Sequence, residues 1–214
     1  MELPFTSDQF FSLFAEYNRA FWMVVAASWL ATVAALASVW RDPARWSPVV
    51  SLFLGVLWLW NAAAYHAFLF TRINPAAWVF SVLFAIQAVL FLRVGLQRRL
   101  VYLSSTSARQ SAGVALISYA LAYPFLTMAL GHTYPATPTF GLPCPTVILT
   151  IGMLLTIRDG APWSLAVIPI LWDFIGGSAA MLLQMPTDYV LLAAGVLLLI
   201  VVAAHRIRLR AVIH

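Results

Sequence analysis

Four side chains in this sequence are of the types that carry chemistry inside apolar proteins. They are the single cysteine, Cys144, the histidines His66 and His132, and Asp173. Thiolate and imidazole groups suit soft transition metals, so His66, His132 and Cys144 are candidate metal ligands. Their spacings match no compact metal motif, and two alternatives stay open: paired histidines can hold a haem, and a cysteine with a histidine can form a nucleophile. The cofactor therefore stays unknown.

Asp173 lies near the middle of a long apolar run, where a carboxylate is costly. On insertion scales, an aspartate at the centre of a membrane helix costs about 2.5 to 3.5 kcal/mol. Ionisable groups inside a membrane are candidates for function by default. Gly176, Gly177 and Ser178 follow it and permit close approach of another helix. Asp173 is therefore either a proton or cation partner or a polar contact that holds two helices together.

The stretch from Gly131 to Thr146, GHTYPATPTFGLPCPT, interrupts the apolar sequence. It holds four prolines, two glycines, His132 and Cys144. Each proline removes a backbone donor and disfavours helical geometry in the residue before it, so no helix is expected through these prolines. Irregular backbone at membrane depth is tolerated only where protein buries it or where it lines a water-filled cavity. We therefore predict a non-helical entrance into a membrane helix, with Cys144 at the positive end of that helix; a rigid external cap is the alternative.

The elements that must position these groups are membrane helices. Of the 214 residues, 63% are hydrophobic and 9% are charged, whereas about a quarter of residues are charged in soluble globular proteins. A span needs roughly 20 residues, so the chain has room for about seven spans in one domain, residues 1–214. We expect an all-α integral membrane bundle whose surroundings are the lipid bilayer.

The basic residues and the cysteine exclude three features. All twelve basic residues are arginines, scattered at expected helix ends, so a nucleic-acid-binding surface is not expected. The absence of lysine excludes a retinal Schiff base. A single cysteine excludes an internal disulfide.

Seven spans are expected to follow a short amphipathic segment over residues 1–19. In that segment Thr6 and Gln9 form a predicted capping box, and Phe5 and Phe10 are placed as a hydrophobic staple. Prolines such as Pro48 mark expected helix starts. The expected spans cover about 20–40, 48–70, 75–96, 111–130, 142–157, 163–183 and 188–205.

Arginine counting predicts the orientation of these spans. In a seven-span arrangement ten arginines fall on the side of the C-terminus, and only Arg19 and Arg72 fall on the other side. The positive-inside rule then places the C-terminus in the cytoplasm and the N-terminus outside. Both candidate histidine ligands and Cys144 come to the outer half of the membrane, with Glu16 and Arg19 at the mouth.

Three segments of the sequence resemble a known family. They are LPFTSDQFFSLFAEYN near the N-terminus, INPAA after the second expected span, and the proline stretch GHTYPATPTFGLPCPT. Together they resemble domain of unknown function family 6064, a family of bacterial multi-span proteins, over the full chain. The resemblance implies a polytopic protein of the bacterial cytoplasmic (inner) membrane, sometimes labelled a permease, and it brings no substrate, activity or catalytic residues.

The pattern predicts a small permease, or a membrane protein that binds a solute or a metal ion, with a polar site opening outward. An intramembrane enzyme that uses Cys144, a histidine and Asp173 is one alternative. A structural or assembly subunit of a membrane complex is another. The candidate site residues are His66, His132, Cys144, Asp173, Glu16 and Arg19.

Overall fold

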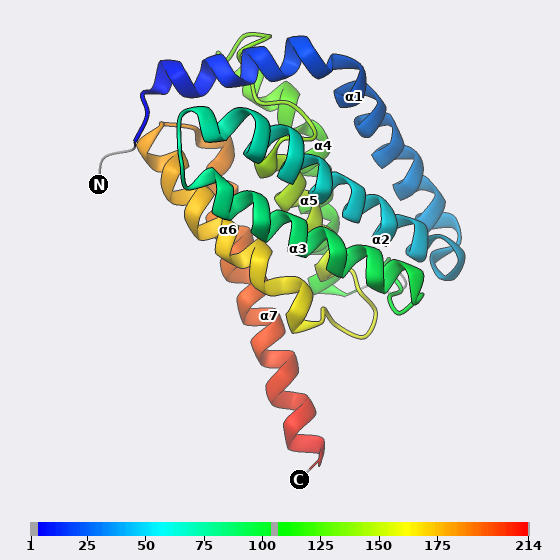
Figure 1. Ribbon diagram of the computed structural model, residues 1–214. Coiled ribbons are helices and arrows are strands. Elements are labelled where there is room, and N and C mark those ends of the chain that lie inside the picture. Colours follow the sequence, from blue (N-terminus) through cyan, green and yellow to red (C-terminus); the bar gives the residue numbers. More distant parts are fainter. Residues whose placement is uncertain (1–3, 104–106, 214) are drawn as a thin grey trace.

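The computed structural model describes residues 4–103 and 107–213, and in these residues the chain forms seven α-helices joined by short connections (Figure 1). The helices are α1 (Ser7–Arg41), α2 (Pro43–Trp60), α3 (Ala77–Leu96), α4 (Ala108–Ala129), α5 (Pro143–Leu155), α6 (Trp163–Leu182) and α7 (Tyr189–Ile213). We call the end of the bundle that α1 crosses in Figure 1 the upper end, and the end from which α7 projects the lower end.

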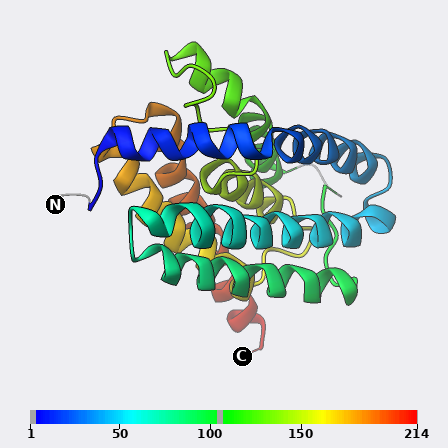
Figure 2. The same cartoon turned by 45° about the horizontal axis from the view of Figure 1, so that its top comes forward.

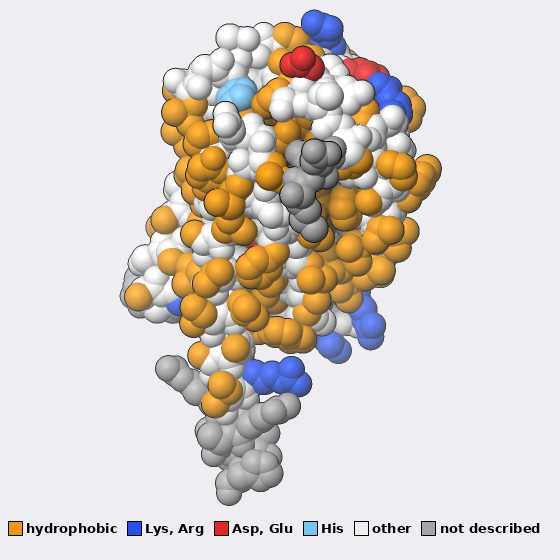
Figure 3. Space-filling view, turned by 90° about the vertical axis from the view of Figure 1, so that its left-hand side faces the viewer, with side chains coloured by type: hydrophobic (Ala, Val, Ile, Leu, Met, Phe, Trp, Pro, Cys, Tyr) orange, Lys and Arg blue, Asp and Glu red, His pale blue; other side chains and the backbone are white. Residues whose placement is uncertain are grey.

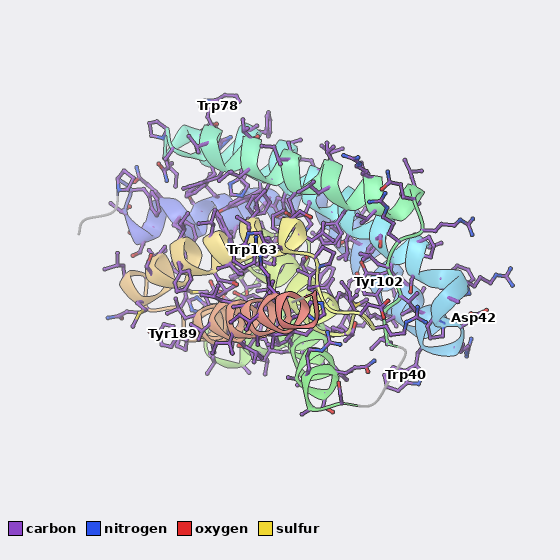
Figure 4. The ribbon with its side chains drawn as sticks, turned by 90° about the horizontal axis from the view of Figure 1, so that it is seen from below. Trp40, Asp42, Trp78, Tyr102, Trp163 and Tyr189 are labelled. Atoms are coloured by element: carbon purple, nitrogen blue, oxygen red, sulfur yellow. The ribbon has the colours of Figure 1, made fainter. Side chains whose placement is uncertain are left out.

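Six helical segments of the described chain are long and apolar enough to cross a membrane. They are Ser7–Arg41, Pro43–Arg72, Ala77–Leu96, Ala108–Ala129, Trp163–Leu182 and Pro186–Ile207. On the face shown in Figure 3, hydrophobic side chains cover the middle of the molecule and arginines lie towards both ends. Trp40 and Trp78 lie at the periphery of the bundle near helix ends (Figure 4), as interfacial aromatic residues do. The chain is thus an all-α, multi-span membrane protein.

The fifth expected span is much shorter than the others. Helix α5 has 13 residues, which at about 1.5 Å per residue is roughly 20 Å long, whereas a hydrocarbon core is about 30 Å thick. Twelve of its residues are buried, and it packs against α2, α4, α6 and α7. Six of the seven expected spans are therefore long apolar segments, and the expected fifth span, 142–157, is the short helix α5 at the enclosed centre of the bundle.

Helix α1 combines the predicted amphipathic segment and the first predicted span in one bent element. It begins with the predicted capping box of Thr6 and Gln9, and the Phe5 and Phe10 rings stack at 5.5 Å. At Phe21 the backbone leaves helical geometry, with φ −121° and ψ 21°. The first arm, Ser7 to Phe21, crosses the upper end, and the second arm descends beside α2 (Figures 1 and 2).

Two features of α2 differ from the sequence expectation. The helix begins at Pro43, with Asp42 capping the backbone N–H of Arg45, so the expected start at Pro48 is wrong and Pro48 lies inside the helix. The helix then widens into a π-helical segment over Asn61–Leu69, which carries His66. Such segments are rare and frequently occur at functional sites. No sequence signal had indicated it.

The proline stretch is non-helical from Gly131 to Leu142, as predicted, and α5 begins at Pro143. Pro143 and Pro145 lie within its first turn, so the expectation that no helix includes them is wrong. The first N–H groups of a helix have no intrahelical acceptor, and prolines therefore cost little there.

Backbone and side-chain hydrogen bonds fix the lower end of α5. The N–H of Arg158 donates to the carbonyl of Val101 (2.9 Å), and the N–H of Leu103 donates to the carbonyl of Thr156 (3.2 Å). The guanidinium of Arg109 donates to the carbonyl of Ile157 (2.7 Å). The chain therefore passes from the upper to the lower end of the bundle through α5 and the irregular backbone on either side of it.

Candidate functional site

A cavity of about 240 Å³ lies beneath the first arm of α1. Its walls come from that arm, the π-helical segment, the start of α3, the first turn of α5, the second half of α6, and the turn that precedes α7. Most of the lining is apolar, and seven of the lining residues are aromatic. These are Phe5, Phe10, Phe14, Tyr65, Phe70, Phe80 and Trp172.

The polar side chains of the lining are those of Asp188, Cys144, Asn74 and Ser178. Asp188 and Cys144 come from the turn before α7 and from the first turn of α5. The hydroxyl of Tyr123 in α4 donates to the Asp188 carboxylate. Asp188 is only 6% exposed. We call Tyr123, Cys144 and Asp188 the carboxylate cluster.

A short turn delivers Asp188 to this position. Residues Pro186–Asp188 form a single 3₁₀ turn between α6 and α7, in which the N–H of Asp188 donates to the carbonyl of Met185 (3.0 Å). The hydroxyl of Tyr119 donates to the Thr187 carbonyl (2.8 Å) and fixes the turn against α4. Sequence reasoning missed Asp188 because an acidic residue after a proline at a helix start is typical of a solvated helix terminus. Only its position beside a long apolar run could have indicated burial.

The first arm of α1 covers the cavity and is held at its C-terminal end by polar contacts. Glu16 forms a two-pronged ion pair with Arg72 at the end of the second span. The buried hydroxyl of Tyr17 donates to the carbonyl of Gly141 (3.2 Å) and accepts from the indole N–H of Trp60 (2.8 Å). Gly141 has φ +86°, and a Cβ there would lie 3.0 Å from the Tyr17 hydroxyl oxygen, so a glycine fits this position best.

Asn18 connects the same arm to the proline stretch. Its amide group donates to the carbonyls of Pro135 (2.6 Å) and Thr137 (2.8 Å), and its side-chain oxygen accepts from the hydroxyl of Thr139. One buried side chain thus replaces the backbone partners that a non-helical segment lacks.

His66 does not line the cavity. It is fully buried, and neither ring nitrogen has a hydrogen-bond partner in the described chain. Its ring lies 4.5 Å from that of Phe84 and 5.1 Å from that of Trp172, measured between centroids. Trp172 lines the cavity, so its indole contacts both His66 and the hollow space.

Asp173 is also separate from the cavity lining. It is fully buried in α6, and its two carboxylate oxygens have no hydrogen-bond partner among the described residues. It packs against α7 at Gly195, where an added Cβ would lie 2.7 Å from the Asp173 Cβ. Asp173 therefore occupies a tight helix contact.

The other predicted site residues lie on the upper surface. The ring of His132 lies 5.1 Å from that of Phe11 on the first arm of α1. Glu16 is paired with Arg72, and Arg19 is exposed. Of the six predicted residues, only Cys144 lines the cavity.

The candidate metal ligands do not converge in the described part of the chain. No group of three His, Cys, Asp or Glu side chains there could hold a metal ion. His66 is surrounded by Tyr65, Phe70, Phe80, Phe84 and Trp172. The geometry that supports a site is instead the combination of an aromatic wall with a buried carboxylate.

The fold and the cavity define a polytopic α-helical membrane protein with an internal solute-sized space near one end. The chain belongs to the family of unknown function DUF6064, whose sequence profile matches residues 7–212, so the family resemblance is confirmed. No curated protein matches the chain, and no solved structure matches it.

Proposed function

We propose that this protein is a small permease or solute-binding protein of the bacterial cytoplasmic membrane, and that its solute occupies the cavity beneath the first arm of α1. The single observation that carries this proposal is the cavity itself, because it joins an apolar wall to a buried carboxylate. Pockets that bind small molecules are mostly apolar with a few placed polar groups. A closed structural bundle has no need of such a space.

The orientation follows from the distribution of charge between the two ends. The connections at the lower end carry most of the arginines, among them Arg41, Arg98 and Arg158, whereas Arg19 and Arg72 lie at the upper end. With α5 and its flanking backbone counted as a crossing, the chain traverses the bilayer seven times. The positive-inside rule then places the lower end in the cytoplasm and the cavity on the outer side.

The lining disfavours the enzyme alternative. A cysteine nucleophile requires a neighbouring base, usually a histidine. No histidine is among the described lining residues, and Cys144 shares the lining with the Asp188 carboxylate instead. A binding role requires only the walls and the polar group that are present.

Cys144 supplies a direct test, because it is the only cysteine and lines the cavity. Intact cells that produce the protein are treated with a membrane-impermeant maleimide, and alkylation is measured by mass spectrometry. We expect slow labelling of Cys144 from outside, since the side chain is only partly exposed. The Cys144→Ser variant has no cysteine and serves as the negative control for labelling.

A second cysteine controls for sidedness. Asp159→Cys in the Cys144→Ser background places an exposed thiol at the lower end, because the Asp159 side chain is 80% exposed. We expect this thiol to react in inside-out vesicles and to resist the reagent in intact cells. The proposal fails if Cys144 reacts only from the cytoplasmic side, or stays unreactive from both sides.

A further inference from the structure

We propose that the solute in this cavity is a small organic cation, such as an ammonium with apolar substituents, whose charge lies between the aromatic rings and Asp188. This inference rests on the proposed function, that the cavity binds a solute. It adds the chemical class of that solute, which neither the family nor the fold supplies.

The charge of the lining carries the first step. Among the described lining residues, Asp188 is the only acidic residue, and none is an arginine or a histidine. The Tyr123 hydroxyl donates to its carboxylate, and this hydroxyl and the Cys144 thiol of the same lining are both neutral. No positive charge among the described lining residues compensates the carboxylate. Burial disfavours its ionised form, and a bound cation would supply the missing partner charge.

The aromatic wall carries the second step. The rings of Phe5 and Phe70 lie 5.4 Å apart, and so do those of Tyr65 and Phe70. On the far wall, Phe80 and Trp172 also lie 5.4 Å apart. Ring faces carry negative electrostatic potential, and aromatic cages attract ammonium groups for that reason.

Other occupants fit the lining less well. An inorganic divalent cation would need six or more oxygen ligands for calcium, or several soft ligands for zinc. The described lining offers one carboxylate, one thiol, the amide of Asn74 and the hydroxyl of Ser178, which are too few for either ion. An anion would meet Asp188 without a basic partner. The volume of about 240 Å³ lies below the range of about 300–1,000 Å³ for drug-sized ligands, which indicates a small molecule.

The test compares two probes of the same shape and different charge. Phenyltrimethylammonium and tert-butylbenzene are isosteres, because a quaternary nitrogen replaces a quaternary carbon. The full-length protein is purified in detergent, and increasing concentrations of each probe are added. The alkylation rate of Cys144 and the midpoint of thermal unfolding are measured at each concentration. We expect the cation to slow alkylation and raise the midpoint, and the neutral isostere to do so at least tenfold less effectively at equal concentration.

Two variants test the two steps separately. Asp188→Asn keeps an oxygen that accepts from Tyr123 and removes the charge, so we expect the affinity for phenyltrimethylammonium to fall tenfold or more. Asp159→Asn makes the same charge change at the lower end and should leave the affinity unchanged. Phe10→Leu keeps the apolar character of a partly exposed position and removes a ring, so the affinity for the cation should fall severalfold while that for tert-butylbenzene changes little.

The outcomes separate this inference from the proposed function. If tert-butylbenzene protects Cys144 as well as the cation does, or if Asp188→Asn binds the cation normally, the cation class is wrong and a solute cavity survives. If neither probe acts, the cation class is also wrong, and the labelling of Cys144 from outside decides whether the cavity is a binding site. If folded Asp188→Asn protein cannot be obtained, Phe10→Leu alone decides whether the rings select for charge.

Discussion

Two buried aspartates in this protein have opposite surroundings. Asp188 lies beside a hollow space that Cys144 also lines, and it accepts a hydrogen bond from Tyr123. Asp173 lies in a tight contact with Gly195 and has no hydrogen-bond partner in the described chain. The first has the space and the donor that a binding group needs, and the second has neither. Depth in an apolar helix is therefore a weaker guide to a binding site than free volume beside the side chain.

The backbone explains the difference. Asp188 is the last residue of a 3₁₀ turn between two helices, where the change in direction leaves room for an irregular wall. Asp173 lies in the middle of α6, where α6 and α7 are in contact and a glycine allows close approach. Three substitutions test this contrast, in order of expected effect on stability.

The largest effect is expected for Gly195→Ala. The new methyl group would lie 2.7 Å from the Cβ and 2.8 Å from a carboxylate oxygen of Asp173, so α6 and α7 must move apart. Overpacking of this kind costs typically about 1–3 kcal/mol. Gly176→Ala is the matched control, because its nearest neighbour is the Trp172 indole nitrogen at 3.1 Å, and that ring borders the cavity and can shift. Unfolding in detergent measures both, and equal losses would contradict the contrast.

An intermediate effect is expected for Tyr123→Phe. The substitution removes a donor to the buried Asp188 carboxylate. Polar contacts between membrane helices contribute on average about 0.6 kcal/mol and at most about 1.7 kcal/mol, and we expect a loss near the upper value because the acceptor is a carboxylate. Tyr119→Phe removes a bond to a neutral carbonyl and should cost less. A smaller loss for Tyr123→Phe than for Tyr119→Phe would show that the carboxylate cluster is not held by this bond.

The smallest effect is expected for Asp173→Asn. No hydrogen bond of the described chain is lost, the shape is kept, and a carboxylate that is costly at this depth is removed. We expect roughly unchanged stability and unchanged protection of Cys144 by phenyltrimethylammonium. A variant that folds normally but loses binding of this probe would make Asp173 the cation partner and reverse the comparison. The same unfolding and alkylation measurements apply.

The sequence predicts the architecture of the bundle better than its site. The lengths of the apolar runs predict the spans. The prolines predict that the stretch from Gly131 to Leu142 is not helical. Together these two signals place Cys144 in the first turn of α5. These are local or one-dimensional signals. They fix the height of a residue in the membrane but not the side of the helix on which it lies.

His66 shows the error that arises when the side of the helix on which a residue lies is unknown. From the rise per helical residue, His66 is expected at the same depth in the membrane as Cys144. The π-helical segment alters the rotation of the chain, and the His66 side chain packs against Trp172 and does not line the cavity. Asp188 was missed for a related reason. Its burial depends on the approach of α4, which is distant in the sequence, and no local pattern encodes that contact.

The enclosure of α5 has a consequence for how the protein is made. This helix emerges before α6 and α7, the helices that later cover two of its sides, and it is too short to rest comfortably in lipid alone. The first four helices and α5 must therefore wait for about the last quarter of the chain before the bundle can close. Premature termination before Trp163 should then leave a product that membrane proteases remove, whereas loss of residues after Arg206, where α7 projects from the bundle (Figure 1), should be tolerated.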